Sequence, residues 1–160
     1  MMRSTNAEDI VRQLTGLDLT IATAESLTAG MLSSAIADIP GASAVLQGGV
    51  VAYNNNIKHK LLGVSADTLA VRGAVDSETA KQMAQGARSR FSADLGIATT
   101  GVAGPEPSEG KTVGLVFIAL ATPDDSIVKL HRFEGGRSEI RRATVAASMK
   151  LVAEWLARRT

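Results

Sequence analysis

Three segments of the chain combine small, polar and glycine residues in a way that could form a reactive site. They are the segments 24–30 (AESLTAG), 53–56 (YNNN) and 99–105 (TTGVAGP). Each follows a short apolar run that is typical of a buried strand. In open α/β sheets, ligands bind in the crevice beyond the carboxyl ends of the strands. If these strand ends lie side by side, the three segments line one pocket for a small molecule.

Ser26 is the first candidate for chemistry, and its position allows two interpretations. Ser26 or Thr28 could simply cap the helix expected after them, because serine and threonine favour the N-cap position. Ser26 could instead be a nucleophile at the start of that helix, where backbone N–H groups can hold an oxyanion or a phosphate. Glu25 is either an acid favoured by the helix dipole or a residue that orients groups in the site.

A serine nucleophile needs a base, and the sequence offers two kinds. The two histidines, His59 and His131, are expected at the surface, and neither completes a convincing Ser-His-Asp set. A lysine that is shielded from water can serve instead. Lys58 follows Tyr53 closely, so a strand end and the next helical turn could present both to one site. Otherwise Lys58 would be a solvated surface residue, and Tyr53 would be half-buried with its hydroxyl in water.

Two further segments could bind an anion. The loop 101–111 is rich in glycine, and such loops bring backbone amides close to phosphate. It is not a Walker A loop, because its glycine spacing is too long and Lys111 leads into an expected strand. Arg137 and Arg141 stand one helical turn apart at the start of the last expected helix. Arginine there opposes the helix dipole and suits an anion, although a solvated helix face is the commoner reason for arginines.

The apolar pattern along the chain predicts an α/β fold. Strands are expected over 17–23, 50–53, 95–99, 112–121 and 127–133, and helices over 7–14, 28–36, 58–62, 77–91 and 140–155. The short connection at Pro123 favours an antiparallel pair for the last two strands. Strands that alternate with helices and end in a hairpin predict a three-layer α/β/α sandwich with a mixed β-sheet.

Composition narrows the class of protein. The chain has 160 residues, 45% of them apolar, which predicts one domain over residues 1–160. A net charge of +1 and 3% aromatic residues disfavour a nucleic-acid partner. Cysteine is absent and no apolar run approaches a membrane span, so we expect no thiolate nucleophile, no membrane partner and a cytoplasmic location. The alanine-rich core and long last helix are compatible with a homo-oligomer such as a dimer, without requiring one.

Four motifs in a fixed order together resemble one family. They are Ala-Glu-Ser-x-Thr-x-Gly at 24–30, Tyr-x-x-x-x-Lys at 53–58, Thr-Gly-x-Ala-Gly-Pro at 100–105 and Gly-x-Arg-x-x-x-Arg at 135–141. Each motif is weak alone, but the ordered set is similar to the CinA C-terminal domain family, the nicotinamide mononucleotide amidohydrolases. The resemblance covers about Ala7 to Ala157. The chain resembles the stand-alone form of the family, which lacks the molybdopterin-binding-like domain of longer members.

The resemblance implies hydrolysis of the carboxamide of nicotinamide mononucleotide to nicotinate mononucleotide and ammonia, in pyridine-nucleotide salvage, without a metal or other cofactor. By motif position it implies that Ser26 is the nucleophile, Lys58 the base and Tyr53 a residue that relays or orients a proton. Lys58 must then be neutral, which requires a dry site or a nearby positive charge such as Arg141. The implied substrate-binding positions are Thr100, Arg141, Arg137, Glu25, Thr28, Gly101 and Gly104.

The chain departs from the family pattern in two places. Leu27 and Ala29 stand where members commonly have cysteine and glycine, and neither position carries the nucleophile. The stretch 106–110 (EPSEG) replaces a glycine-rich stretch, so affinity or specificity for the substrate could differ. The alternative function is a non-catalytic nucleotide-binding or regulatory domain of the same fold, associated with competence or DNA damage. The presence of Ser26, Tyr53, Lys58 and Thr100 favours the enzyme.

Overall fold

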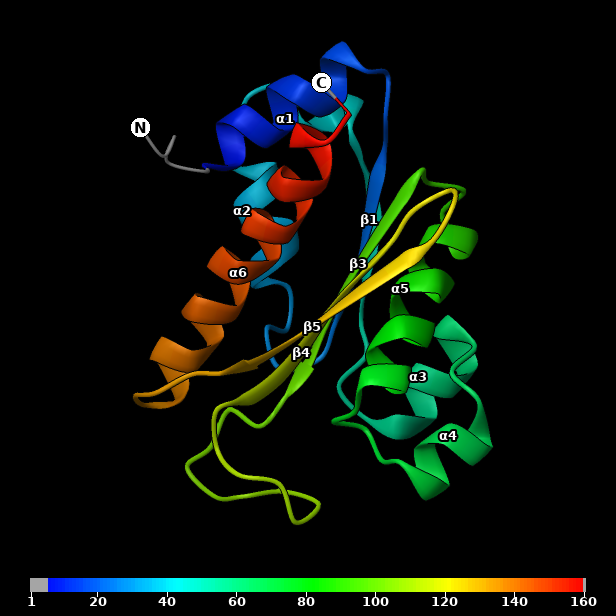
Figure 1. Ribbon diagram of the computed structural model, residues 1–160. Coiled ribbons are helices and arrows are strands. Elements are labelled where there is room, and N and C mark those ends of the chain that lie inside the picture. The colour runs from blue at the N-terminus through cyan, green and yellow to red at the C-terminus, as the bar shows by residue number, and fades with distance from the viewer. Residues whose placement is uncertain (1–5, 160) are drawn as a thin grey trace.

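A five-stranded mixed sheet forms the centre of the molecule (Figure 1). The computed structural model describes residues 6–159. The strands lie in the order β2-β1-β3-β4-β5, with bounds β1 Ile21–Glu25, β2 Leu46–Val51, β3 Leu95–Gly101, β4 Leu115–Ala121 and β5 Ser126–Arg132. β1 runs parallel to β2 and β3, whereas β4 runs antiparallel to β3 and β5. The predicted antiparallel pair at the end of the sheet is therefore confirmed.

Helices cover both faces of the sheet (Figure 1). One face carries α1 Ala7–Gly16, α2 Met31–Ala37 and α6 Arg137–Ala157; the other carries α5 Ser77–Arg90, with α3 Asn55–Leu62 and α4 Ala66–Val71 beside it. A short 3-10 helix, Ala42–Ala44, precedes β2. The predicted three-layer α/β/α sandwich is confirmed. Among residues 6–159, no helix combines the length and the apolar character that a membrane crossing requires.

The chain changes direction across the sheet at β1. After β1 it passes to β2 on one side, and after β2 it returns to β3 on the other side of β1. Such a switch leaves a crevice beyond the carboxyl end of the central strand, where α/β proteins bind their ligands. Ser26 directly follows β1, so the topology alone places it at this crevice.

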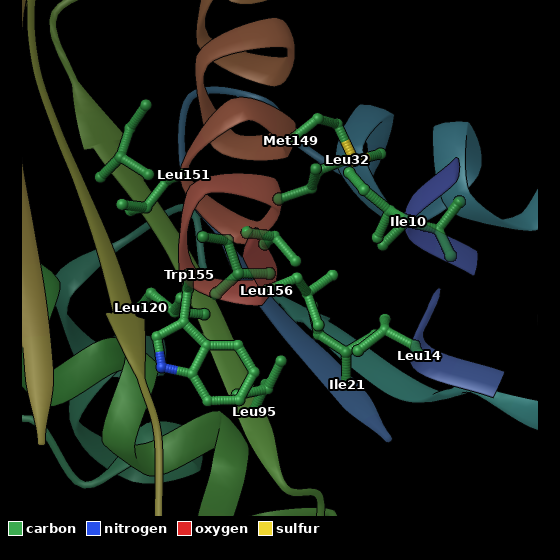
Figure 2. Packing of buried hydrophobic residues seen from close by; sticks show 14 of the residues in the cluster. Ile10, Leu14, Ile21, Leu32, Leu95, Leu120, Met149, Leu151, Trp155 and Leu156 are labelled. Atoms are coloured by element: carbon green, nitrogen blue, oxygen red, sulfur yellow. The ribbon is translucent and has the colours of Figure 1, made fainter. Parts of the chain in front are cut away.

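The two faces of the sheet bury different kinds of side chain. Large aliphatic side chains face α1, α2 and α6, where Leu95 and Leu120 pack with Leu14, Leu156 and Trp155 (Figure 2). The face toward α5 is built mainly from alanine, including residues 22, 24, 98, 119 and 121 of the strands and 80, 84 and 87 of the helix. Small side chains let α5 approach the sheet closely. This pattern follows from the alternation of side chains along each strand.

Glycine allows the closest approach, at the contact between α5 and α3. A Cβ at Gly86 would lie 1.9 Å from the backbone carbonyl oxygen of Leu62, so only glycine fits there without movement. Leu62 ends α3, the helix that also carries Lys58. The contact between Gly86 and Leu62 therefore helps to set the position of α3, and with it the position of Lys58.

Three local features differ from the sequence-based expectations. α2 begins at Met31, with Gly30 as its N-cap, so neither Ser26 nor Thr28 caps this helix. The sequence also favours Ser77 as the N-cap of α5, because serine prefers that position, but Asp76 is the cap, since its side chain accepts a hydrogen bond from the backbone N–H of Glu78. The apolar pattern does not predict α4, since six residues are too few to show a helical period.

The Gly86 contact makes a prediction about stability. Gly86→Ala should lower the free energy of unfolding by about 1–3 kcal/mol, because the added methyl group overpacks the contact with Leu62. Denaturant titration measures the change. Gly16→Ala is the matched control, since a Cβ at that helical glycine meets nothing within 4 Å and alanine is the better helix former. Equal stability of the two variants would contradict the prediction.

Candidate active site

A tight turn after β1 presents Ser26 to a pocket. The Ser26 N–H donates to the carbonyl of Thr99 (3.0 Å), and the Ala29 N–H donates back to the carbonyl of Ser26 (3.1 Å). Ala29 and Gly30 both have left-handed backbone conformations, with φ values of 46° and 101°. The chain therefore turns sharply before α2 begins, and the Ser26 hydroxyl lines the pocket instead of capping the helix.

Glu25 provides the cap that Ser26 does not. Its buried carboxylate accepts hydrogen bonds from the backbone N–H groups of Leu32 (2.8 Å) and Ser33 (3.1 Å) and from the Ser33 hydroxyl (2.7 Å). A carboxylate at a helix N-terminus also interacts favourably with the helix dipole. Glu25 therefore lies behind the turn and outside the pocket lining, where it orients α2 against the end of β1.

Lys58 lies beside Ser26 in the interior. Asn54 starts α3 by accepting a hydrogen bond from the Ile57 N–H (3.0 Å), and this directs Lys58 inward one turn later. The Lys58 Nζ donates to the Ser26 Oγ (3.0 Å) and to the carbonyl of Ala52 (2.9 Å). Only 1% of Lys58 is exposed. The two histidines are elsewhere: His59 Nδ1 lies 2.7 Å from the carbonyl of Val64, and His131 stacks on Phe133.

Burial makes the Lys58 amine a usable base. Desolvation lowers the pKa of Lys58 to about 8, against a smaller upward effect of the Glu109 charge. The expected dry site is therefore the cause, and Arg141 is not among the groups that lower this pKa. A neutral amine can keep its bond to Ala52 as a donor while its lone pair accepts the hydroxyl proton of Ser26. The pair can thus activate the serine oxygen near neutral pH.

Tyr53 and Arg137 meet at the open side of the pocket. The Arg137 Nη2 donates to the Tyr53 hydroxyl (2.8 Å), and its Nη1 donates to the carbonyl of Gly104 (2.6 Å). Both side chains line the pocket, and 57% of Tyr53 remains exposed. The Tyr53 hydroxyl therefore hydrogen-bonds to the arginine, and within residues 6–159 it makes no hydrogen bond to Ser26 or Lys58.

The end of β3 and the loop after it form the opposite wall. Thr100 is buried, lines the pocket, and donates its hydroxyl proton to the carbonyl of Ala74 (2.7 Å). Gly101 and Gly104 also line the pocket. Packing explains both glycines, because a Cβ at Gly101 would lie 2.6 Å from Val116 and one at Gly104 would lie 2.7 Å from Val113.

Arg141 and Thr28 lie outside the pocket lining. The Arg141 guanidinium donates from Nε to the carbonyl of Leu27 (2.8 Å) and from Nη2 to the carbonyl of Thr28 (3.3 Å). The Thr28 hydroxyl lies 2.8 Å from the Thr99 hydroxyl in the interior. Both residues therefore fix the turn that carries Ser26, whereas the sequence motif placed them at the substrate.

The pocket formed by these elements has a volume of about 240 Å³. Of the ten sequence-predicted site residues, those that line it are Ser26, Tyr53, Lys58, Thr100, Gly101, Gly104 and Arg137. It also includes Ala74 and Val75, between α4 and α5, and the acidic side chains of Glu106 and Glu109. Sequence reasoning missed the segment 74–75, because a wall made of backbone leaves no signature in residue types.

Across residues 6–159, no three His, Asp or Glu side chains cluster in a way that could hold a metal ion.

Comparison with known proteins identifies the family model that the chain matches. The model of the CinA C-terminal domain matches residues 3–156. A Desulforamulus reducens protein, provisionally named competence-damage inducible, is 50% identical over 93% of this chain and 36% of its own length. A CinA-like protein of Frankia casuarinae is 48% identical over 86% of this chain and 32% of its own length. The chain thus spans about a third of these curated relatives.

The fold also matches a solved structure of similar sequence. The competence/damage inducible protein CihA of Agrobacterium tumefaciens is 40% identical to this chain, with a TM-score of 0.89. The match covers 92% of this chain and 92% of that one. The similarity therefore extends over most of the sheet and of the helices on its two faces.

The buried amine predicts a pH-dependent stability difference that does not require any activity. Below about pH 8, Lys58 is protonated in both the folded and the unfolded chain, and the folded state carries the full cost of the buried charge. Between about pH 8 and 10.5, the folded state loses the proton first, so the cost decreases as pH rises. Lys58→Met should therefore raise the free energy of unfolding at pH 7 by about 1–3 kcal/mol.

Denaturant titrations of the parent and of Lys58→Met at several pH values test this difference. The difference in the free energy of unfolding between Lys58→Met and the parent should decrease steadily toward pH 10.5, the ordinary pKa of lysine. Lys60→Met is the control, because Lys60 is exposed on the same helix and its replacement should change stability by less than about 0.5 kcal/mol. If the stability difference between Lys58→Met and the parent stays constant with pH, burial does not destabilise the charged amine.

Proposed function

The chain belongs to the CinA C-terminal domain family, and on that premise we propose that it is an amidohydrolase that acts on nicotinamide mononucleotide. The products are nicotinate mononucleotide and ammonia. The observation that carries the proposal is the contact between the buried Lys58 Nζ and the Ser26 Oγ, at 3.0 Å. A helix cap or a simple binding site would not need a desolvated amine beside a hydroxyl.

The first half of the reaction forms a covalent intermediate. The Ser26 Oγ bonds to the carboxamide carbon while its proton passes to the neutral Lys58 Nζ. The resulting ammonium then gives a proton to the amide nitrogen, the carbon–nitrogen bond breaks, and ammonia leaves. This step leaves a nicotinate mononucleotide ester on Ser26 and a neutral Lys58.

The second half of the reaction releases the product. Lys58 accepts a proton from water as the water oxygen bonds to the ester carbon. The ammonium then returns that proton to the Ser26 Oγ as the carbon–oxygen bond to serine breaks. Nicotinate mononucleotide leaves, and both residues return to their starting states. One lysine therefore serves in turn as base and acid, which requires a pKa not far from the working pH.

The turn after β1 supports stabilisation of the oxyanion. The backbone N–H of Leu27, which follows Ser26 and lines the pocket, donates no hydrogen bond to any group within residues 6–159. Arg141 holds the carbonyls of Leu27 and Thr28. Fixed N–H donors next to a nucleophile are the usual means of stabilising charge on a tetrahedral intermediate. The turn is thus suited to receive the carboxamide oxygen.

Arg137 supports recognition of the nucleotide part of the substrate. It is an exposed cation at the start of α6 and lines the pocket beside Tyr53. A guanidinium can bind a phosphate through two parallel hydrogen bonds. Because Arg137 lines the pocket and is exposed, whereas Arg141 lies outside the lining, we assign phosphate recognition to Arg137.

Ammonia release tests the proposed reaction. The parent protein should release ammonia from nicotinamide mononucleotide and much less from free nicotinamide, which lacks the phosphate. Ser26→Ala and Lys58→Ala should each abolish release, because they remove the nucleophile and the base. Mass spectrometry of a quenched reaction should detect the nicotinate mononucleotide ester on the peptide that contains Ser26.

Two controls make this test specific. Ser34→Ala and Lys60→Ala alter exposed residues of the same two helical regions, and both should retain the parent rate. Undiminished release by Ser26→Ala or Lys58→Ala would refute the assigned roles. A parent protein that binds nicotinamide mononucleotide without releasing ammonia would favour the non-catalytic alternative.

The position of Arg141 predicts a particular kinetic signature. Arg141→Lys keeps the charge but loses the fork that holds two carbonyls, so the turn becomes less ordered. The value of kcat should fall roughly 10–100-fold while KM changes by less than about 3-fold. Arg142→Lys, at the exposed neighbouring position, is the control and should leave both constants unchanged. A rise in KM with constant kcat would place Arg141 at the substrate after all.

A further inference from the structure

The carboxylate of Glu109 joins the loop after β3 to the segment between α4 and α5. Its two oxygens accept hydrogen bonds from the backbone N–H groups of Ala74 (3.0 Å) and Val75 (3.3 Å). Lys111, two residues later, lies 3.6 Å from the same carboxylate and donates to the carbonyls of Arg72 (3.0 Å) and Val75. The loop therefore binds backbone N–H groups of this segment through the Glu109 carboxylate. It binds backbone carbonyls of the same segment through the Lys111 amine.

Gly73 leaves room for this contact. A Cβ at Gly73 would lie 2.5 Å from the Glu109 Oε2, and the backbone there is left-handed, with φ of 86°. Gly63 is also left-handed, with φ of 69°, but a Cβ there would meet nothing within 4 Å. A glycine at position 73 thus meets two requirements: it adopts the left-handed conformation of the turn, and it lets the Glu109 carboxylate come close to the backbone.

The same contact holds two walls of the pocket together. Ala74 and Val75 form one wall, and Glu106, Ser108 and Glu109 form the other. Thr100 adds a third link through its bond to the Ala74 carbonyl. Without the Glu109 carboxylate, the loop would still contact this segment through the Lys111 bonds and the packing of Val75 with Val102 and Val113, but the N–H groups of Ala74 and Val75 would lose their acceptor.

The charge of Glu109 also acts on the interior of the pocket. The charged or titratable groups that line the pocket with Lys58 are Tyr53, Glu106, Glu109 and Arg137. Among them, Glu109 raises the pKa of Lys58, against the larger opposite effect of burial. Burial would raise the pKa of Glu109 itself, but its bonds to Ala74 and Val75 and the nearby Lys111 lower it overall. Glu109 therefore stays ionised at neutral pH.

We propose that Glu109 is a positioning residue: its carboxylate holds the loop 101–114 against the segment 73–75 and keeps a fixed negative charge in the pocket of Lys58. The kinetic consequences rest on the proposed function, but the effect of the charge on the amine does not. With Glu109 neutralised, the protonated amine loses a favourable interaction. Lys58 then releases its proton at lower pH, and the low-pH limb of the activity profile moves the same way.

A titration of the amine tests the effect of the charge directly. The chain contains six lysines, so an NMR titration of labelled lysine side chains is simple to follow, and Lys58→Met identifies the Lys58 signal. Glu109→Gln keeps the shape of the side chain and removes its charge. The midpoint of the Lys58 titration should fall by ~0.5 pH unit. Glu106→Gln is the matched control, on the same loop and in the same pocket, and should leave the midpoint in place.

Hydrogen exchange tests the mechanical part of the proposal. Glu109→Ala should increase the exchange rates of the Ala74 and Val75 amides, because both lose their acceptor. Glu106→Ala should leave both rates unchanged. Persistent protection of these amides in Glu109→Ala would overturn the assigned contact, even if the variant loses activity.

The rate measurements separate a positioning role from a merely structural one. In Glu109→Gln, the low-pH limb of the profile for ammonia release should move down by the same amount as the Lys58 midpoint. A lower rate with an unmoved profile and an unmoved midpoint would overturn the proposal. If the parent releases no ammonia at any pH, the proposed function fails, while the Lys58 midpoint and the amide exchange still confirm or overturn the role of Glu109.

Discussion

The removal of one amine from water is the constraint on which the rest of the site depends. Lys58 is almost fully buried, yet it is hydrogen-bonded to a backbone carbonyl and to Ser26. Protein interiors accept a lysine where its polar atoms are paired, and burial favours the neutral amine. The close contact of α3 with Gly86 and the alanine-rich packing of α5 hold the amine in place. Packing far from the pocket therefore determines the chemistry inside it.

The three basic side chains near Ser26 divide their tasks according to what surrounds them. Lys58 is dry and can become neutral, Arg141 is bound to backbone carbonyls, and Arg137 is exposed at the open side of the pocket. Residue type alone does not distinguish an arginine that binds substrate from one that orders a turn. The two arginines are one helical turn apart, but only one of them lines the pocket.

The fold could be predicted to a large extent from short apolar runs bounded by turn residues, as β3 and β4 illustrate, and from the polar segments that follow strands. Ser26 and Lys58 could be identified as candidates because their segments follow expected strands, but the residues alone left other interpretations open, and the resemblance to the family supplied their roles. The capping role of Glu25 could not be predicted, because the N–H groups that it binds come seven and eight residues later in the chain. A turn with two left-handed residues brings them back to the carboxylate. The contact of Glu109 with the segment 74–75 could not either, because backbone N–H groups are common to nearly all residues.

The bonds from Arg141 to the turn at Leu27 and Thr28 link positions more than a hundred residues apart in the chain. Protein synthesis delivers β1 long before α6, which carries Arg141. A chain still attached to the ribosome can hold its nucleophile long before the guanidinium that orders the surrounding backbone has left the exit tunnel. The fold therefore defers assembly of the site until α6 has been made, so that chains without α6 are expected to lack it.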